Sequence, residues 1–298
     1  MKKMTKDDLL ANAPWKERRT VVFLSDFGTS DGAVSAMHGV ANAVSPSLGL
    51  FDLTHDVPQF NIWEASYRLA QSLPYWAAGT VFVCVVDPGV GSDRKSIVAL
   101  TASGHLIVTP DNGTLTHISD RIGLLEVRSI EVETNRLAGS QKSHTFFGRD
   151  VYAYTGARLA AGEIAFEELG SVLDDVVALE IERPRLEGGS LSGAIDILDT
   201  RYGSLWTNIP SDLLDDMGVD YGDMLDVMIS KDGRVVYGYH LPLCKAFTDV
   251  QKGEALLYIN SLLNLAIAIN QGSFASSYQI GTGEGWKIVF SLAAKRAN

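Results

Sequence analysis

The stretch Thr20-Val21-Val22-Phe23-Leu24-Ser25-Asp26-Phe27-Gly28 decides how the first part of this chain folds. Its β-branched and aromatic start predicts a buried strand, its polar end predicts a loop, and the composition of residues 33–43 predicts a helix. The same order recurs downstream, with strands expected at residues 48–53 and 80–86 and a helix at residues 62–73. Apolar strands that lack period-two alternation and are separated by helices are typical of a mostly parallel sheet between helices.

The pattern changes farther along the chain. Residues 96–101 and 105–109 flank a Ser-Gly turn signal and predict a hairpin, and a helix with Asp150 as its N-cap is expected at residues 150–161. After the charged segment 180–189, short apolar runs alternate with turns and little helix. These runs cover residues 191–198, 204–209, 224–230, 234–240, 255–259 and 285–290. We therefore expect an α/β N-terminal domain at residues 18–180 and a smaller β-rich C-terminal domain at residues 188–298.

Composition excludes several classes of protein. The chain has 298 residues, 46% of them hydrophobic, and a formal net charge of −11, which argues against nucleic acid or an anionic membrane as its partner. It contains no apolar run of bilayer-spanning length, and its N-terminus lacks the apolar core of a secretion signal. The two cysteines, Cys84 and Cys244, are far apart and suit a reducing compartment. We expect a soluble, cytoplasmic protein.

The loop Asp87-Pro88-Gly89-Val90-Gly91-Ser92-Asp93-Arg94 is the first candidate for chemistry. Asp87 ends a strand that should be buried, and the two glycines allow a tight loop. Arg94 follows seven residues later and can fold back onto the carboxylate, which would then orient a water molecule or accept its proton. A turn in which Asp87 caps its own loop while Arg94 lies at the surface explains the same spacing.

Other polar residues also stand at expected strand ends. Asp26 suits the hydroxyls of a ribose, as acidic residues at strand ends do in dinucleotide sites, but a helix cap is the plainer explanation. Arg149 is a candidate partner for a carboxylate or a ligand. The six histidines show no metal-ligand spacing, and a hydrogen-bonded structural role is expected for His55. We predict no metal site and no cofactor.

The segment Asp199-Thr200-Arg201-Tyr202-Gly203-Ser204-Leu205-Trp206-Thr207-Asn208 gathers a carboxylate, aromatic rings and an amide around one turn of the C-terminal domain. Such a cluster suits an adenine ring and an amino group. It equally suits an ordinary hairpin, and composition does not decide between the two.

These segments together resemble the S-adenosylmethionine hydrolases, or hydroxide adenosyltransferases, which are related to bacterial fluorinases and chlorinases. Seven motifs match in order across residues 20–290. They are Ser25-Asp26-Phe27-Gly28, Thr54-His55-Asp56, Val85-Val86-Asp87-Pro88-Gly89-Val90-Gly91-Ser92, Pro110-Asp111-Asn112-Gly113, Thr145-Phe146-x-Gly148-Arg149-Asp150, Trp206-Thr207-Asn208-Ile209 and Ile259-Asn260-Ser261. Seven ordered motifs are much more specific than any one of them.

The resemblance implies an α/β N-terminal domain, a β-barrel-like C-terminal domain, and a homotrimer whose sites lie between the N-domain of one subunit and the C-domain of the next. It implies S-adenosylmethionine as substrate, with Asp87 and Arg94 as catalytic residues. The substrate-binding positions that it implies, together with the candidates above, are Asp26, Phe60, Gly148, Arg149, Asp199, Tyr202, Ser204, Phe247, Asn260 and Ser261. By position, Asp26 would hold the ribose, Asp199 the methionine ammonium and Ser261 the carboxylate, while Phe60 would pack on the ligand and Tyr202 and Phe247 would flank the purine.

The resemblance also indicates which nucleophile is used. The halogenating relatives have a Tyr at the position of Asp87, and the fluorinase has a Ser at the position of Gly148, so this chain matches the hydrolases at both positions. It departs from them at Phe147, where the hydrolases have a His that completes an Asp, Arg, His set. His144 lies three residues earlier and is a possible substitute. Ser204 stands where relatives have an Asn, and Leu262 where the fluorinase has an Arg.

Three hypotheses follow. The first is hydrolysis of S-adenosyl-L-methionine to adenosine and L-methionine by in-line attack of water at C5′. The second is an adenosyl-binding protein with little or no turnover, because Phe147 removes a hydrogen-bond partner from the water. The third is a halide adenosyltransferase, for which Asp87 is the wrong residue.

Overall fold

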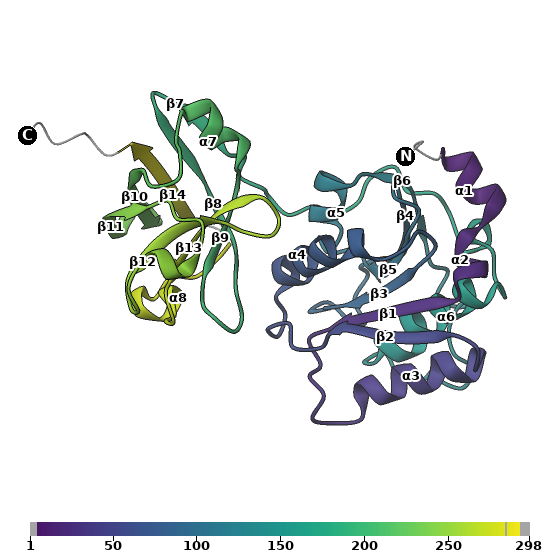
Figure 1. Ribbon diagram of the computed structural model, residues 1–298. Helices are drawn as coiled ribbons and strands as arrows, with labels where there is room; N and C mark the ends of the chain where they lie inside the picture. The colour runs from purple at the N-terminus through teal and green to yellow at the C-terminus, as the bar shows by residue number, and fades with distance from the viewer. Residues whose placement is uncertain (1–4, 284, 293–298) are drawn as a thin grey trace, which may run out of the picture. The chain divides into compact units, whose positions relative to one another are not determined.

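The computed structural model describes residues 5–283 and 285–292, and the chain divides into two compact units at Leu179/Glu180 (Figure 1). Each unit has its own hydrophobic core and is described by itself. No helix among the described residues is long and apolar enough to cross a membrane.

The N-terminal unit is built on a six-stranded mixed sheet with strand order β2-β1-β3-β5-β4-β6. The first four strands in this order are parallel, and β4 runs antiparallel to both of its neighbours. Their bounds are β1 Thr20–Ser25, β2 Gly49–Thr54, β3 Val81–Val85, β4 Ser96–Thr101, β5 Leu106–Pro110 and β6 Leu124–Ser129. The expected hairpin at 96–109 is therefore confirmed, and β6 is a strand that the sequence did not reveal.

Helices cover both faces of this sheet (Figure 1). Alternate residues of β1 enter different cores: Val21 and Phe23 pack with α3 and α6, whereas Val22 and Leu24 pack with α4 and α5. A strand buried on both faces reads as a continuous apolar run, which is why the sequence predicted a covered sheet. The helices are α1 Lys6–Asn12, α2 Pro14–Arg18, α3 Ala33–Val44, α4 Ile62–Ser72, α5 Thr116–Arg121 and α6 Tyr154–Ala161, with short 3-10 turns at Leu73–Tyr75 and Phe166–Glu168.

The helix expected at residue 150 begins earlier and differently. A π-helical turn covers Gly148–Ala153 and continues into α6, so Asp150 is not an N-cap. The chain is already helical at Phe147, and Asp150 is fully buried, where one carboxylate oxygen accepts from Arg149 Nε at 2.6 Å. Single π-helical turns often occur at functional sites because they re-aim the side chains around them.

The C-terminal unit is an antiparallel sheet whose main path runs β11-β10-β14-β8-β9-β13-β12, with β7 paired to β8. A bridge between Leu243 and Leu257 links the two ends of this path, so the sheet nearly closes into a barrel around its apolar core. The strand bounds are β7 Arg185–Glu187, β8 Ser190–Leu198, β9 Leu205–Pro210, β10 Met224–Lys231, β11 Arg234–Pro242, β12 Ala255–Ile259, β13 Asn264–Ile269 and β14 Trp286–Leu292. The short helices are α7 Asp212–Met217, a 3-10 turn at Phe247–Asp249, and α8 Phe274–Tyr278.

The expected fold class, an α/β unit followed by a β-barrel-like unit, is confirmed. Besides β6, the sequence did not reveal β7 and β13, and β13 was missed because its apolar run follows closely on that of β12.

Candidate functional site

Asp87 and Arg94 form a two-pronged ion pair. Arg94 Nε donates to Asp87 Oδ1 at 2.7 Å, and Nη2 donates to Oδ2. The pair is largely shielded, with 5% of the Asp87 side chain and 10% of the Arg94 side chain exposed. A planar guanidinium that binds both oxygens fixes the direction of the carboxylate, which a surface ion pair does not do. Of the two arrangements that the sequence allows for this loop, the structure has the one in which Arg94 folds back onto Asp87, and not the one in which Arg94 lies at the surface.

Further side chains hold the Arg94 guanidinium in place. Its Nη1 donates to Ser96 Oγ at 3.1 Å, and that hydroxyl lies 3.1 Å from the hydroxyl of Tyr152. Burial raises the pKa of Tyr152, which therefore stays protonated and uncharged at neutral pH. Phe147 completes this support, because its ring lies under the Arg94 guanidinium at 5.5 Å and under that of Arg136 at 5.2 Å.

Two glycines let the backbone approach this closely. Gly91 has φ +80, and a Cβ there would lie 2.9 Å from the carbonyl oxygen of His144, so the loop after β3 packs directly on the segment before the π-helical turn. At Gly148 a Cβ would lie 3.1 Å from the Phe27 ring and 3.3 Å from Val85. Any larger residue at either position has to displace its neighbours.

A cavity of about 300 Å³ opens in front of Asp87. It brings together four residues that the sequence singled out, Asp26, Phe60, Asp87 and Gly148, from four separate segments. The complete lining is Asp26, Phe27, Asp31, Ala33, Gln59, Phe60, Val85, Asp87, Val90, Thr145, Phe146, Phe147 and Gly148. The cavity thus combines three loop carboxylates, Asp26, Asp31 and Asp87, with aromatic walls, as expected at the carboxyl ends of parallel strands.

Asp26 and Phe60 are directly connected. The backbone N–H of Phe60 donates to Asp26 Oδ2 at 2.9 Å. Phe60 has φ +65, a left-handed conformation that costs a bulky residue of order 1 kcal/mol, and 66% of its surface is exposed. A strained residue with an exposed ring beside a cavity is typical of a ligand contact.

Two further candidates lie elsewhere. Arg149 pairs with Asp150 and packs over the ring of Phe146 at 4.9 Å, and it is not among the described residues that line the cavity. His144 is exposed and also absent from that lining, although its ring centroid is 6.4 Å from that of Phe147. The position that faces the Arg94 pair is therefore filled by Phe147, which is 8% exposed.

The C-terminal unit contains a second cavity, of about 870 Å³. All six substrate-binding candidates of this unit line it: Asp199, Tyr202, Ser204, Phe247, Asn260 and Ser261. The other lining residues are Arg201, Trp206, Tyr258, Ile269, Asn270, Gln271, Gly272 and Ser273.

Aromatic side chains shape this second cavity. The rings of Phe247 and Tyr258 lie 5.0 Å apart, and Trp206 Nε1 donates to the Tyr258 hydroxyl at 2.9 Å. Burial raises the pKa of Tyr258, so its hydroxyl remains a neutral hydrogen-bonding group. Tyr202 and Phe247 are 71% and 47% exposed. Such exposed rings offer stacking surfaces to a planar ligand.

Hydrogen bonds to the backbone of the adjacent turns orient two polar side chains of this cavity, Asp199 and Asn260. Asp199 Oδ1 accepts from the backbone N–H groups of Arg201 at 3.0 Å and Tyr202 at 2.9 Å. Asn260 Oδ1 accepts from the backbone of Leu262 and Asn264, whereas Asn260 Nδ2 is buried without a partner among the described residues. A buried donor without a partner is costly, and a ligand acceptor in the cavity would remove that cost.

The sequence did not reveal the residues that support the ion pair of Asp87 and Arg94. Arg136 is 9% exposed, donates to Ser140 Oγ and Ser140 O, each at 2.9 Å, and lies over the Phe147 ring. Tyr152 and Ser96 reach Arg94 from the π-helical turn and from β4. Each looks like an ordinary core or loop residue in sequence, and no local signal marks it.

Comparison with known proteins shows which family this chain resembles. Residues 21–170 match the SAM hydroxide adenosyltransferase N-terminal domain, and residues 193–287 match the corresponding C-terminal domain. The chain is 34% identical to an (R)-S-adenosyl-L-methionine hydrolase of Methanocaldococcus jannaschii, over 81% of this chain and 84% of the relative. It is 28% identical to a fluorinase of an Actinoplanes species, over 88% of this chain and 95% of that protein.

A solved structure of an uncharacterized conserved protein from Thermotoga maritima superposes with a TM-score of 0.82 at 34% identity, covering 91% of this chain and 99% of that one. Both domain models match in order and together span most of the chain, and the fold agrees with that of this structural neighbour. The chain therefore belongs to the SAM hydroxide adenosyltransferase family.

Proposed function

We propose that the protein hydrolyses S-adenosyl-L-methionine to adenosine and L-methionine. The observation that carries this proposal is the Asp87 carboxylate, held by both prongs of Arg94 at the wall of the N-terminal cavity. Relatives named (R)-S-adenosyl-L-methionine hydrolases from four organisms are 30 to 34% identical to this chain.

The reaction needs an oriented water and little else. A sulfonium makes C5′ electrophilic, so the water oxygen forms a bond to C5′ as the C5′–S bond breaks and its electron pair stays on sulfur. The water proton leaves by way of the Asp87 carboxylate. Each oxygen of Asp87 keeps a second lone pair while it accepts from Arg94, so it can also accept a hydrogen bond from water. Positioning of this kind can supply ~7–11 kcal/mol of the barrier when the reacting atoms are well oriented.

Two features favour water over halide. A carboxylate repels an anion, and Asp87 faces the cavity in which a halide would have to be held. At Gly148, a side chain that would offer a halide a hydroxyl would crowd the Phe27 ring and Val85.

We assign the second cavity to the recognition of substrate. Tyr202 and Phe247 offer exposed rings to the purine, and Asp199 offers a carboxylate to the methionine ammonium. Asn260 Nδ2 and the Ser261 hydroxyl would donate to the methionine carboxylate. Ser204, a buried lining residue that hydrogen-bonds with Tyr258, would add a hydroxyl to the wall of this cavity. In the first cavity, Asp26 would accept from the ribose hydroxyls while Phe60 packs on the sugar.

A second candidate function is binding of an adenosyl ligand with little turnover. Phe147 favours it, because a buried ring stands where a third hydrogen-bonding group would orient the water. Tight, saturable binding of S-adenosylmethionine without product would support this alternative.

Incubation of the protein with S-adenosylmethionine, followed by chromatography, tests both. The hydrolase predicts equimolar adenosine and methionine, and Asp87→Asn, which keeps the shape and removes the charge, should lower the rate by ~10²-fold or more. Asp93→Asn, an exposed change in the same loop, is the matched control and should leave the rate unchanged. Unchanged turnover in Asp87→Asn would overturn the proposal, and a halogenated adenosine at high halide would point to the third reaction.

We also propose that the protein is a homotrimer whose partner is a small molecule and that the reaction requires no cofactor. Light scattering of the purified chain checks the oligomeric state, and a monomer that is fully active would exclude the trimer as a requirement.

A further inference from the structure

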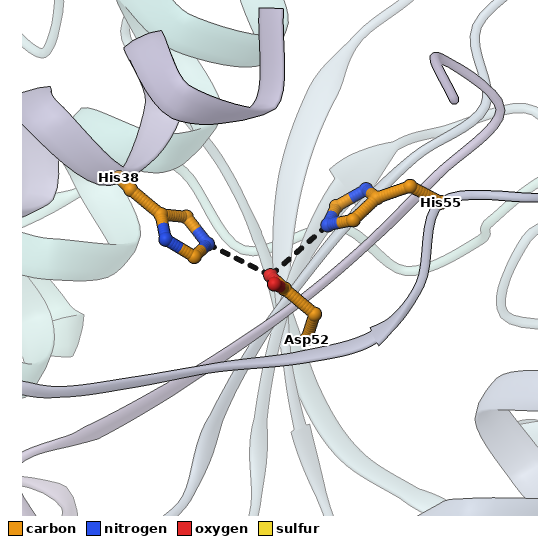
Figure 2. Close-up of side chains that lie close together, drawn as sticks. All are labelled: His38, Asp52 and His55. Atoms are coloured by element: carbon orange, nitrogen blue, oxygen red, sulfur yellow. Dashed lines mark hydrogen bonds and ion pairs between the residues drawn. The ribbon is translucent and has the colours of Figure 1, made fainter. Parts of the chain in front are cut away.

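Three side chains outside the proposed reaction converge on one point at the edge of the N-terminal sheet. His38 comes from α3, Asp52 from β2, and His55 from the residue after Thr54, where β2 ends (Figure 2). Nε2 of His38 lies 2.7 Å from Asp52 Oδ1, and Nε2 of His55 lies 3.0 Å from the same oxygen. All three potential ligand atoms lie within 4.8 Å of one another.

The two nitrogen–oxygen distances are close to those between neighbouring ligand atoms of one metal ion. Bonds of about 2.0 to 2.2 Å from a zinc ion to nitrogen and oxygen place neighbouring ligand atoms roughly 3 Å apart. Two imidazoles and one carboxylate are a ligand set that divalent transition metals favour over Mg²⁺ or Ca²⁺, which prefer oxygen alone. Both Nε2 atoms face Asp52 Oδ1, so an ion would take the place of these two hydrogen bonds and the three side chains would shift to surround it.

Both imidazoles are held by groups behind them. His55 Nδ1 lies 2.7 Å from the buried hydroxyl of Ser25, and the His38 ring packs 4.8 Å from the ring of Phe23, centroid to centroid. Hydrogen bonding at the second nitrogen is the usual way in which a protein fixes a metal-ligating histidine. The His55 side chain is 2% exposed, whereas those of His38 and Asp52 are 30% and 43% exposed, so an ion would reach the site from solvent and keep water on its open side.

The charges also suit a cation. Asp52 supplies a carboxylate oxygen and His38 and His55 each supply an imidazole nitrogen, and the carboxylate and the neutral imidazole are the forms in which these groups bind metal ions.

We propose that His38, Asp52 and His55 form a binding site for one divalent transition metal ion of the Zn²⁺ class. The ion ties α3 to the edge strand β2. Through His55 it also braces the loop that carries Asp26, because His55 Nδ1 contacts Ser25 and the His55 carbonyl accepts from the Gly28 N–H at 2.8 Å. The site is structural, and no step of the hydrolysis passes through it.

Metal binding to the full chain, without an affinity tag and after treatment with chelator, tests this. Zn²⁺ is titrated in competition with a chromophoric chelator, and Co²⁺ is titrated while its visible absorption is recorded. We expect one equivalent per chain and a Co²⁺ spectrum typical of nitrogen and oxygen ligands. His38→Ala and Asp52→Ala remove ligands that are partly or fully accessible and should weaken binding by ~10²-fold or more, while Ser25→Ala should weaken it by ~10-fold through His55.

The chain provides a matched control. His240 and Asp226 form an exposed histidine–carboxylate pair on β11 and β10 that lacks a second imidazole among the described residues. His240→Ala should leave the stoichiometry and affinity unchanged. Circular dichroism of each variant without metal identifies any variant that fails to fold, and only the folded variants are used to judge metal binding.

Hydrogen exchange provides the second measurement. Added Zn²⁺ should slow exchange at Phe27 and Gly28 in the wild type and not in His38→Ala. Absence of stoichiometric binding, or binding that survives both His38→Ala and Asp52→Ala, would overturn the site. Binding without slower exchange at Phe27 and Gly28 would overturn the bracing of the Asp26 loop.

Discussion

The guanidinium of Arg94 lies over the ring of Phe147, with its Cζ 5.5 Å from the ring centroid, while two of its nitrogens bind the two oxygens of Asp87. The ring therefore acts on the carboxylate through the arginine. Phe147 also lies under Arg136, which anchors the preceding loop at Ser140. The residue that departs from the hydrolase motif thus has a packing role here, because a ring face attracts both cations.

Arg94→Lys tests the two-pronged pair. Lysine keeps the positive charge but is a single point donor, so it cannot bind both Asp87 oxygens or lie flat on the Phe147 ring. We expect kcat/KM for S-adenosylmethionine to fall by ~10²-fold with little change in stability, measured by product formation and urea unfolding. Arg18→Lys, an exposed change in α2, is the control. Equal activity of the two variants would show that the geometry of the pair is unimportant.

Phe147→His tests whether the phenyl ring lowers kcat because it offers the water no hydrogen-bond partner. An imidazole there would be kept neutral by the nearby Arg94 and Arg136, because like charges disfavour its protonation, and it would offer the water a hydrogen-bond partner. We expect kcat to rise by ~10-fold or more. Phe147→Leu adds no such partner and should give no rise. If both variants behave alike, the effect comes from packing alone.

Gly148→Ala tests the close approach in the first cavity. The added Cβ would lie 3.1 Å from the Phe27 ring and 3.3 Å from Val85, so their contacts must shift. We expect a loss of ~1–3 kcal/mol in the free energy of unfolding, as for other overpacked positions, and a higher KM. Gly39→Ala is the comparison, because in α3 its Cβ meets nothing within 4 Å, and the helix should gain up to ~1 kcal/mol. Equal effects of the two changes would refute the crowding.

His117 should make the fold sensitive to acid. Burial, assisted by the charge of Arg121, lowers the pKa of His117 from 6.5 to about 3, and its Nε2 is buried without a partner among the described residues. Below pH 6.5 the unfolded chain binds a proton that the native protein rejects, so the stabilising contribution is complete above that pH and is lost as the pH falls. The slope from this one group approaches about 1.4 kcal/mol per pH unit.

Urea unfolding between pH 7.5 and 5.5, above the range in which most carboxylates titrate, measures this slope. His117→Gln keeps a polar side chain that does not titrate, so its unfolding free energy should depend less on pH. His144→Gln, at an exposed position, should follow the wild type. An unchanged slope in His117→Gln would mean that other groups cause the acid sensitivity.

Much of the fold was predictable because it follows from local patterns. The run at Val81–Val85 predicted a buried strand, and the hairpin at 96–109 followed from its turn signal. The start of the helical segment at Gly148 was not predictable, because a π-helical turn depends on the packing around Asp150 and not on capping chemistry. The β13 strand was missed because one apolar run follows another closely.

By itself, the sequence determined the alternation of strands and helices, the change to β structure near residue 188, and the motifs that place Asp87 and Asp199 at strand ends and turns, since these depend on residues near one another in the chain. Only the tertiary structure decided which side chains meet. The support of Arg94 by Phe147 and Tyr152, and the convergence of His38, Asp52 and His55, bring together residues from separate elements. Spacing along the chain carries no record of such contacts, because the packing of the sheet and its helices creates them.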